Sequence, residues 1–192
     1  MDDPEQAQGD VVPTDAARLL ADIRPLPSRT WRLAVQEFTR LPLLAWGVAW
    51  VLGYGAVQLL PPWIGLGAFT VLGVAALTLT RFVATPDLQS GWETQFRRCW
   101  WALIGVTPLL GLIIQPTPLP TLLLLLGALW GVALLLYAVA ITDWALGMVG
   151  VTIVVSAAAS HVLAGGWSLL CFGAVGGGAM AILGSVRLLR PA

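Results

Sequence analysis

The sequence contains no lysine and few charged residues of any kind. All ten basic residues are arginine, and charged side chains make up only 10% of the 192 residues, against about 25% in ordinary soluble domains. Without lysine, the chain cannot form a Schiff base with retinal or pyridoxal phosphate. The net charge is zero, so the sequence lacks the basic surface typical of nucleic-acid-binding proteins and predicts no nucleic-acid partner.

Cysteine and histidine are also scarce. The two cysteines, Cys99 and Cys171, fall at opposite ends of the predicted helices, too far apart for a disulfide, and we interpret both as small apolar packing residues. One histidine and two distant cysteines offer no metal-ligand spacing, and the sequence contains no GxSxG, Walker or HExxH motif. We therefore expect no catalytic residues, no metal site and no cofactor.

Apolar residues, in contrast, make up 58% of the chain. No charged side chain occurs in residues 41–80, 99–142 or 144–186, which are blocks of 40, 44 and 43 residues. A bilayer core about 30 Å thick is crossed by roughly 20 helical residues, so each block predicts two spans joined by a tight turn. The predicted fold is an all-α integral membrane protein with six transmembrane helices arranged as three helical hairpins.

Proline and glycine mark the turn inside each block. A Pro-Pro pair at 61–62 divides the first block, a proline-rich turn at 116–120 the second, and a Gly-Gly pair at 165–166 the third. Proline cannot continue a helix interior but can begin the next helix. The predicted transmembrane domain, residues 42–186, therefore contains spans at 42–60, 63–83, 99–115, 120–142, 144–164 and 167–186.

Polar segments flank the spans. Residues 1–28 are predicted to form a polar tail without a cleaved signal, and residues 187–192 a short polar C-terminus. Residues 29–41 carry apolar side chains at helical spacing. This pattern predicts either an amphipathic helix that lies in the membrane interface or a direct extension of the first span.

The most polar link follows the second span. Trp92 and Phe96 lie at helical spacing there, next to Arg97 and Arg98. The pattern predicts an amphipathic helix on the membrane surface, and these four residues are the candidate surface for a partner or for lipid.

The arginines orient the predicted bundle. They flank the first span, the link between the second and third spans, and the end of the sixth span, whereas the three hairpin turns carry no charge. Because cytoplasmic loops carry the excess of basic residues, we expect both termini in the cytoplasm. The expected location is a bacterial inner membrane, with a photosynthetic internal membrane as the alternative.

One acidic residue, Asp143, lies in the tight link between the fourth and fifth spans. A carboxylate in this position can accept a hydrogen bond from the first turn of the fifth span. We expect it to cap that helix, with Arg97 or Arg98 as an alternative ionic partner.

A few polar residues within the spans are candidates for ligand binding. His161 could ligate a haem or a pigment from one side. It could instead share an apolar-solute site with Gln58 and Gln115, which fall at the same membrane depth. Thr107 and Pro108 predict a kink in the third span, a feature that some transporters place at binding sites. The structural alternative for His161 is a polar side chain at the interface.

Small residues recur every four positions in the last two spans. The row of the fifth span is Thr152, Ser156 and Ser160, and the row of the sixth span is Gly173, Gly177, Ala181 and Ser185. Small side chains allow helix backbones to approach closely in lipid. We expect the fifth and sixth spans to form a tight antiparallel pair through these rows, with contact to a second subunit as the alternative.

Three functional hypotheses remain open. The first is a non-catalytic subunit, scaffold or assembly factor of a membrane complex, with membrane-protein partners or a second copy of the chain besides the lipid bilayer. The second is a binding or permeation component for an uncharged or apolar solute. The third is a pigment- or haem-binding membrane protein that uses His161. A solid bundle would favour the first hypothesis, and a central cavity the second.

Overall fold

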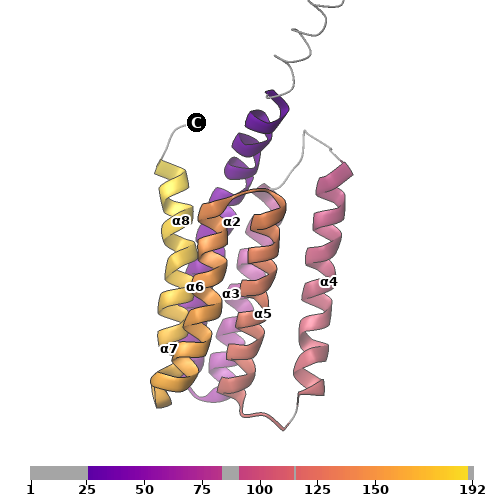
Figure 1. Ribbon diagram of the computed structural model, residues 1–192. Coiled ribbons are helices and arrows are strands. Elements are labelled where there is room, and N and C mark those ends of the chain that lie inside the picture. The colour runs from indigo at the N-terminus through magenta and orange to yellow at the C-terminus, as the bar shows by residue number, and fades with distance from the viewer. Residues whose placement is uncertain (1–25, 84–90, 115, 190–192) are drawn as a thin grey trace, which may run out of the picture.

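The computed structural model of the chain describes residues 26–83, 91–114 and 116–189, which are almost entirely helical (Figure 1). The first five helices are α2 (Leu26–Leu59), α3 (Pro62–Val83), α4 (Gly91–Ile113), α5 (Leu119–Ala140) and α6 (Trp144–Leu163). The last part contains the 3₁₀ turn η2 (Gly165–Trp167), α7 (Ser168–Phe172), the π-helical segment η3 (Gly173–Gly177) and α8 (Gly178–Leu189). Because α7, η3 and α8 follow one another without a break, they form one helix with a π-helical middle.

Five helical segments of the described chain are long and apolar enough to cross a bilayer. They are Thr39–Leu59, Pro62–Phe82, Leu119–Ala140, Trp144–Leu163 and Gly165–Leu189. The apolar part of α4, Arg98–Ile113, is shorter, so a sixth crossing through α4 stays a prediction. The expectation of an all-helical bundle suited to a membrane is confirmed at this level.

Helix α2 continues well beyond its apolar part. It has 34 residues, about 50 Å at 1.5 Å per residue, and its apolar segment begins only at Thr39. In Figure 1 its first turns project past the ends of the other helices. The segment 29–41 is therefore a direct extension of the first apolar helix and not a separate helix in the interface.

The two ends of the bundle differ in composition. The start of α2, the end of α3, the start of α4, the α5–α6 turn and the end of α8 lie at one end (Figure 1). The described arginines from Arg40 onward, namely Arg40, Arg81, Arg98 and Arg187, belong to the parts of α2, α3, α4 and α8 nearer this end, and we call this the arginine end. The opposite end contains the turns that follow α2, α4 and α6.

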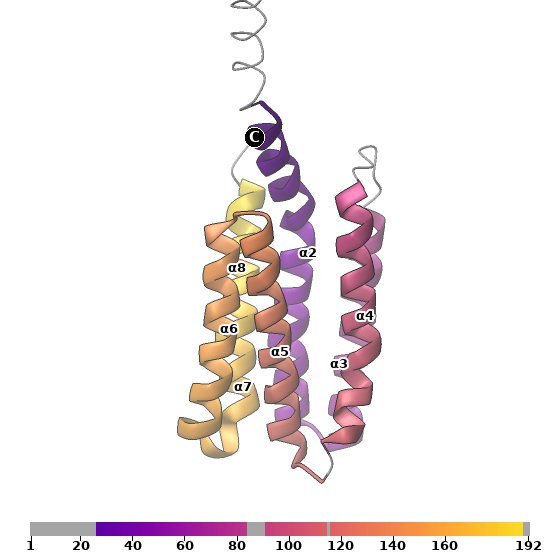
Figure 2. The ribbon, with the colours of Figure 1, turned by 45° about the vertical axis from the view of Figure 1, so that its right-hand side comes forward.

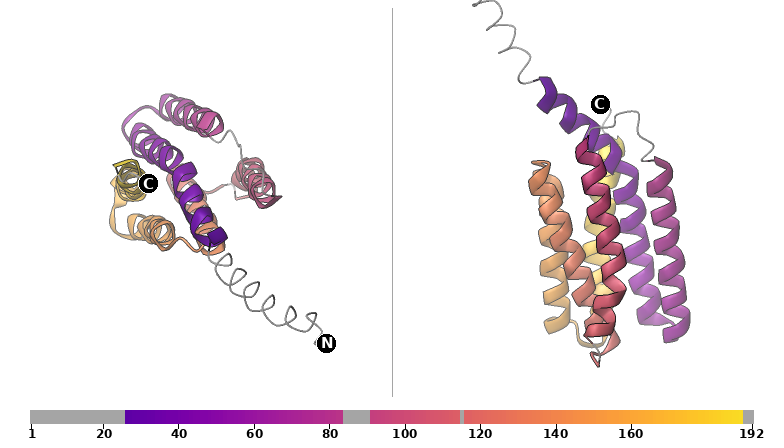
Figure 3. Two further views of the ribbon diagram at one scale, coloured as in Figure 1. Left: turned by 90° about the horizontal axis from the view of Figure 1, so that it is seen from above. Right: turned by 90° about the vertical axis from the view of Figure 1, so that its right-hand side faces the viewer.

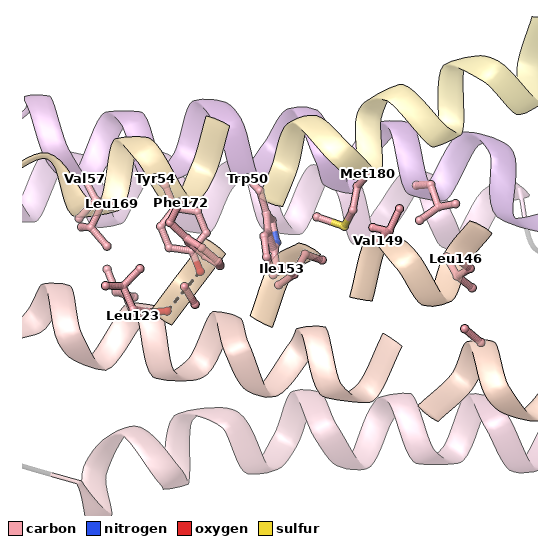
Figure 4. Close-up of a cluster of buried hydrophobic side chains, with 14 of the residues drawn as sticks. Trp50, Tyr54, Val57, Leu123, Leu146, Val149, Ile153, Leu169, Phe172 and Met180 are labelled. Carbon is pink, nitrogen blue, oxygen red and sulfur yellow. Dashed lines mark hydrogen bonds between the residues drawn. The ribbon is translucent and has the colours of Figure 1, made fainter. Parts of the chain in front are cut away.

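The buried core lies between α2, α5, α6 and the α7–η3–α8 helix (Figure 4). Its four most deeply buried large side chains are Leu146, Ile153, Leu169 and Phe172. Helix α2 packs against α3 on one side and against η3 and α8 on another, while α5 packs along α6. The core is therefore built from segments far apart in sequence.

Helices α3 and α4 form the outer flank of the bundle. Only 11% of the apolar span of α3 is buried, against 39% for α2, and none of the described α4 side chains from Arg98 onward is buried. Figures 2 and 3 show α4 standing beside the other helices. Trp100 of α4 stacks on Trp130, with ring centroids 5.5 Å apart, and Trp130 stacks on Trp46 at 6.1 Å. This stack of three indoles connects α4 to α5 and α2.

Candidate functional site

The interior of the described bundle offers few reactive groups. No three His, Cys, Asp or Glu side chains of the described residues gather into a possible metal site, and Cys99 and Cys171 are separate free thiols. Within residues whose side chains are described, every buried side-chain nitrogen or oxygen has a hydrogen-bond partner. Two polar contacts between helices and one close approach of helix backbones define the candidate sites.

The first is a buried charge network at the arginine end, formed by Thr39, Asp143 and Arg187, which we call the charge clamp. Nη2 of Arg187 lies 2.5 Å from Oδ2 of Asp143, and Nη1 donates to Oγ1 of Thr39 at 2.6 Å. The Arg187 and Asp143 side chains are only 8% and 10% exposed. The charge clamp therefore joins α8, the α5–α6 turn and α2 at a single point.

The backbone of the α5–α6 turn places Asp143 in the charge clamp. The amides of Thr142 and Asp143 donate to the carbonyls of Val139 and Ala138, the pair of bonds that defines a Schellman ending. Thr142 adopts φ +54°, a conformation that is unusual for a β-branched residue. Oδ1 of Asp143 then accepts from the amide of Leu146 at 3.1 Å.

The turn confirms one prediction about Asp143 and corrects another. Asp143 caps α6 as expected. Its ionic partner among the described side chains, however, is Arg187 and not Arg98, while the side chain of Arg97 lies outside the described residues. Arg187 comes from a helix more distant in sequence, and it reaches Asp143 because α8 ends beside the α5–α6 turn.

The second contact is a close approach of α2 to the η3–α8 helix, which we call the glycine seam (Gly47, Gly173, Gly177 and Gly184). A Cβ atom on Gly177 would lie 2.8 Å from the Gly47 carbonyl oxygen, and one on Gly184 would lie 2.6 Å from the Leu44 amide. A Cβ on Gly47 would collide with the backbone of Ala181. The two helix backbones are therefore in contact along this seam, and only glycine, which has no Cβ atom, fits between them.

The glycine seam corrects the expected partner of the small-residue row in the last span. The row was expected to face the fifth span, but Gly173, Gly177 and Ala181 lie against α2. On α6, Ser156 and Ser160 are buried, while Thr152 bonds back to the Met148 carbonyl. Ser185 of α8 is partly buried. The closest packing along α6 is instead with α5, where a Cβ on Gly150 would lie 2.8 Å from the Leu135 amide.

Aromatic side chains fill the space next to the glycine seam. Tyr54 lies edge-on to Phe172 at 4.8 Å between ring centroids and to Phe69 at 5.0 Å, and Trp50 lies 5.6 Å from Phe172. Phe172 is fully buried, and Figure 4 shows it next to Tyr54 and close to Trp50. Trp50 thus belongs to the buried core, and Trp46 and Trp130 pack against that core.

The third contact lies at the opposite end of the bundle, where Gln58 of α2 reaches the turn before α7. Its Nε2 donates to the carbonyl of Gly166 at 2.7 Å, and its Oε1 accepts from the amide of Leu169 at 3.2 Å. The Leu169 amide belongs to the first turn of α7, which lacks a side-chain cap of its own. Gln58 therefore caps a helix more than a hundred residues away in sequence, and we call this contact the glutamine cap.

Replacing Gln58 by leucine should lower the free energy of unfolding by about 1–2 kcal/mol, because two hydrogen bonds are lost at similar side-chain volume. Gln58→Glu is the matched control. It keeps an acceptor for the Leu169 amide at a helix N-terminus but loses the donor to Gly166, so an intermediate loss is expected. The measurement is unfolding of the purified protein in mixed micelles. Equal stability of wild type and Gln58→Leu would show that the glutamine cap contributes nothing.

The predicted solute group does not come together around Gln58, whose side-chain amide is used in the glutamine cap. His161 is exposed near the end of α6, and Gln115 lies outside the described residues. Thr107 donates to the Leu103 carbonyl within α4, and Pro108 lies inside the same helix. The described members of the group thus bond to backbone or face outward.

The predicted surface segment after the second apolar helix is part of α4. This helix begins at Gly91 and continues to Ile113, so Trp92 and Phe96 belong to its first turns and do not form a separate helix. The side chains of Trp92, Phe96 and Arg97 lie outside the described residues. Arg98 is exposed.

Comparison with known proteins adds no relative. No protein-family model, curated protein or solved structure matches this chain. The functional interpretation therefore depends on contacts within the molecule.

Sequence reasoning missed Arg187 and Gly47. In the sequence, Arg187 is only one of the arginines that follow the last span. One available signal was its position as the first charged residue after the uncharged block 144–186. Gly47 belongs to no row of small residues in its own helix, so periodicity could not identify it. Only the position of α2 against α8 reveals its role.

Proposed function

We propose that the protein is a non-catalytic subunit, scaffold or assembly factor of a membrane complex. The observation that carries this proposal is the use of polar side chains in contacts between helices. The charge clamp and the glutamine cap join helices through their polar groups, and the glycine seam brings two backbones together, so these groups are not available to a substrate. Use of the polar groups in such contacts suits a protein that works through its surface.

The surface that we propose for contact with a partner is the outer flank of α3 and α4. Val71 and Val74 of α3 are 68% and 57% exposed, and Leu109 and Leu112 of α4 are 57% and 72% exposed. These helices contribute little to the core, although they carry large apolar side chains. A partner helix packed on this flank would bury apolar surface without disturbing the core.

The proposed orientation places the arginine end in the cytoplasm. Short cytoplasmic loops carry the excess of basic residues, and the described arginines lie at this end. The extension of α2 then projects into the cytoplasm, and the uncharged turns lie on the outer side. A bacterial inner membrane is the proposed location.

Photo-crosslinking in the native membrane tests this proposal. A photoreactive amino acid replaces Val74 of α3 or Leu109 of α4. The matched control replaces Val155, which is 59% exposed on α6, a helix that lies away from α3 and α4 (Figure 3). We expect a protein adduct of one discrete mass from position 74 or 109 and none from position 155.

Two results would contradict the proposal. One is the absence of any protein adduct at positions 74 and 109. The other is recovery, after gentle extraction, of a lone monomer that carries a small molecule in stoichiometric amount.

A further inference from the structure

Arg81 and Trp101 form an exposed pair at the arginine end of the outer flank. The guanidinium carbon of Arg81 lies 5.7 Å from the centre of the Trp101 ring, within the range of a cation–π contact. The pair connects the last turn of α3 to the start of the apolar part of α4. Stacking uses the flat face of the guanidinium and leaves its N–H groups available at the edge.

Arg98 adds a second exposed guanidinium three residues before Trp101. Among the side chains that the structure describes, no carboxylate pairs with Arg81 or Arg98. The described acid at this end, Asp143, is used by Arg187 in the charge clamp. Asp87 and Glu93 lie outside the described side chains. The described surface at this point is therefore basic and unneutralised.

Below these arginines the flank is apolar and is not closed by helix packing. Helices α3 and α4 follow one another in sequence, yet their backbones make almost no close contact. Phe82 is 74% exposed and Trp101 is 44% exposed, and the apolar part of α4 spans only Arg98–Ile113. At 1.5 Å per residue this part of α4 is about 24 Å long, short for a bilayer core of about 30 Å. An apolar chain placed between α3 and α4 would cover exposed apolar side chains such as Phe82 and Trp101.

We propose that the opening between α3 and α4 at the arginine end binds one anionic phospholipid. Its phosphate contacts the N–H groups of Arg81 and Arg98, and Trp101 lies at headgroup depth. Its acyl chains lie along the apolar side chains of α3 and α4. This site does not depend on the proposed function, because it requires no protein partner.

Charge and shape together favour a phospholipid over other anions. A free phosphate would satisfy the two guanidinium groups but would leave the apolar opening uncovered. An acidic peptide would likewise pair with the two guanidinium groups and leave the apolar side chains below them uncovered. Basic pockets between transmembrane helices on the cytoplasmic side are a known form of anionic lipid site.

Lipid titration of the purified full-length chain tests this proposal. Phosphatidylglycerol, phosphatidylcholine and inorganic phosphate are added separately to protein in neutral detergent, and bound lipid is counted by native mass spectrometry. The site variant is Arg81→Gln/Arg98→Gln, with Trp101→Leu as a second variant that leaves the charges in place. Arg29→Gln/Arg32→Gln, in the extension of α2, removes the same charge elsewhere and is the matched control.

We expect one phosphatidylglycerol to bind more tightly than phosphatidylcholine, and its affinity to fall about 30-fold in the double arginine variant. Each arginine near anionic lipid contributes about 1 kcal/mol, and about 1.4 kcal/mol corresponds to a factor of ten. Trp101→Leu should weaken binding by a smaller factor, and the control variant should retain the wild-type affinity. Inorganic phosphate at the same concentration should not displace the lipid.

Each opposite result would overturn the proposal. If the site variant and the control variant lose equal affinity for phosphatidylglycerol, the lipid is attracted by the overall positive charge and not by this site. Equal binding of phosphatidylcholine, or displacement by inorganic phosphate alone, would exclude an anionic phospholipid as the specific occupant.

Discussion

Replacing Arg187 by methionine is expected to lower the free energy of unfolding by about 3–5 kcal/mol. Methionine preserves much of the apolar stem but leaves the Asp143 carboxylate buried without a positive partner, and an uncompensated buried charge carries a cost of this size. Thr39 loses its hydrogen bond from Nη1 as well. The measurement is equilibrium unfolding in mixed micelles, with the intrinsic signal of the tryptophans as the probe.

A double-mutant cycle separates charge from packing in this experiment. Asp143→Asn retains a side-chain acceptor for the Leu146 amide, since asparagine also caps helices well, but it leaves Arg187 unpaired. Arg187→Met/Asp143→Asn should be more stable than the sum of the single losses predicts, because no buried charge remains. Arg98→Met, at an exposed position, should change stability by less than about 0.5 kcal/mol. Additive losses in the cycle would show that the charge pair itself does not stabilise the bundle.

Replacing Gly177 by alanine should destabilise the protein by about 1–3 kcal/mol, the usual cost of overfilling a packed interior. The new Cβ would lie 2.8 Å from the Gly47 carbonyl oxygen and 2.9 Å from the Val51 amide nitrogen. Both neighbours are backbone atoms of a helix, so they cannot rotate away as a side chain would. Helix α2 and the η3–α8 helix must then separate along the glycine seam.

The adjacent residue supplies the control for this prediction. A Cβ on Gly178 would meet no atom within 4 Å, so Gly178→Ala should be neutral or stabilise the helix by about 0.5–1 kcal/mol, because alanine loses less backbone entropy. Both variants are measured by the same unfolding assay. Destabilisation of similar size at both positions would point to the flexibility of the π-helical segment, and would contradict the close approach of α2.

The two predictions concern different contacts in the bundle. The charge clamp determines how α2, α8 and the α5–α6 turn meet at the arginine end, whereas the glycine seam determines how closely α2 and α8 run together toward the opposite end. If both predictions hold, the core is held together both at the arginine end and along the contact between α2 and the η3–α8 helix.

Asp143 shows which contacts can be predicted from neighbouring residues in the sequence. Its place directly before an apolar run predicts a helix cap, because capping depends on groups three residues away. Its ionic partner lies 44 residues further along the chain, and nothing local distinguishes Arg187 from the other arginines. The cap could therefore be predicted, and the ion pair could not.

The small-residue row of the last span shows the same limit in helix packing. Spacing of four residues identifies a face on which backbones can approach, and the row at Gly173, Gly177 and Ala181 is indeed a face of close approach. Periodicity does not identify the partner helix. We expected the neighbour in sequence, α6, but the turn at η2 leaves this face directed at α2.

The sequence by itself determined that the chain is a bundle of apolar helices broken at proline and glycine, with the arginines outside the apolar blocks. It could do so because the cost of placing charge in lipid and the length needed to cross it are local properties of each segment. Only the tertiary structure decided that α2 meets α8 through glycine, that Arg187 meets Asp143, and that α3 and α4 remain on the outside. These contacts depend on how the helices are arranged around one another, and a helical face in the sequence is compatible with any neighbour of matching shape.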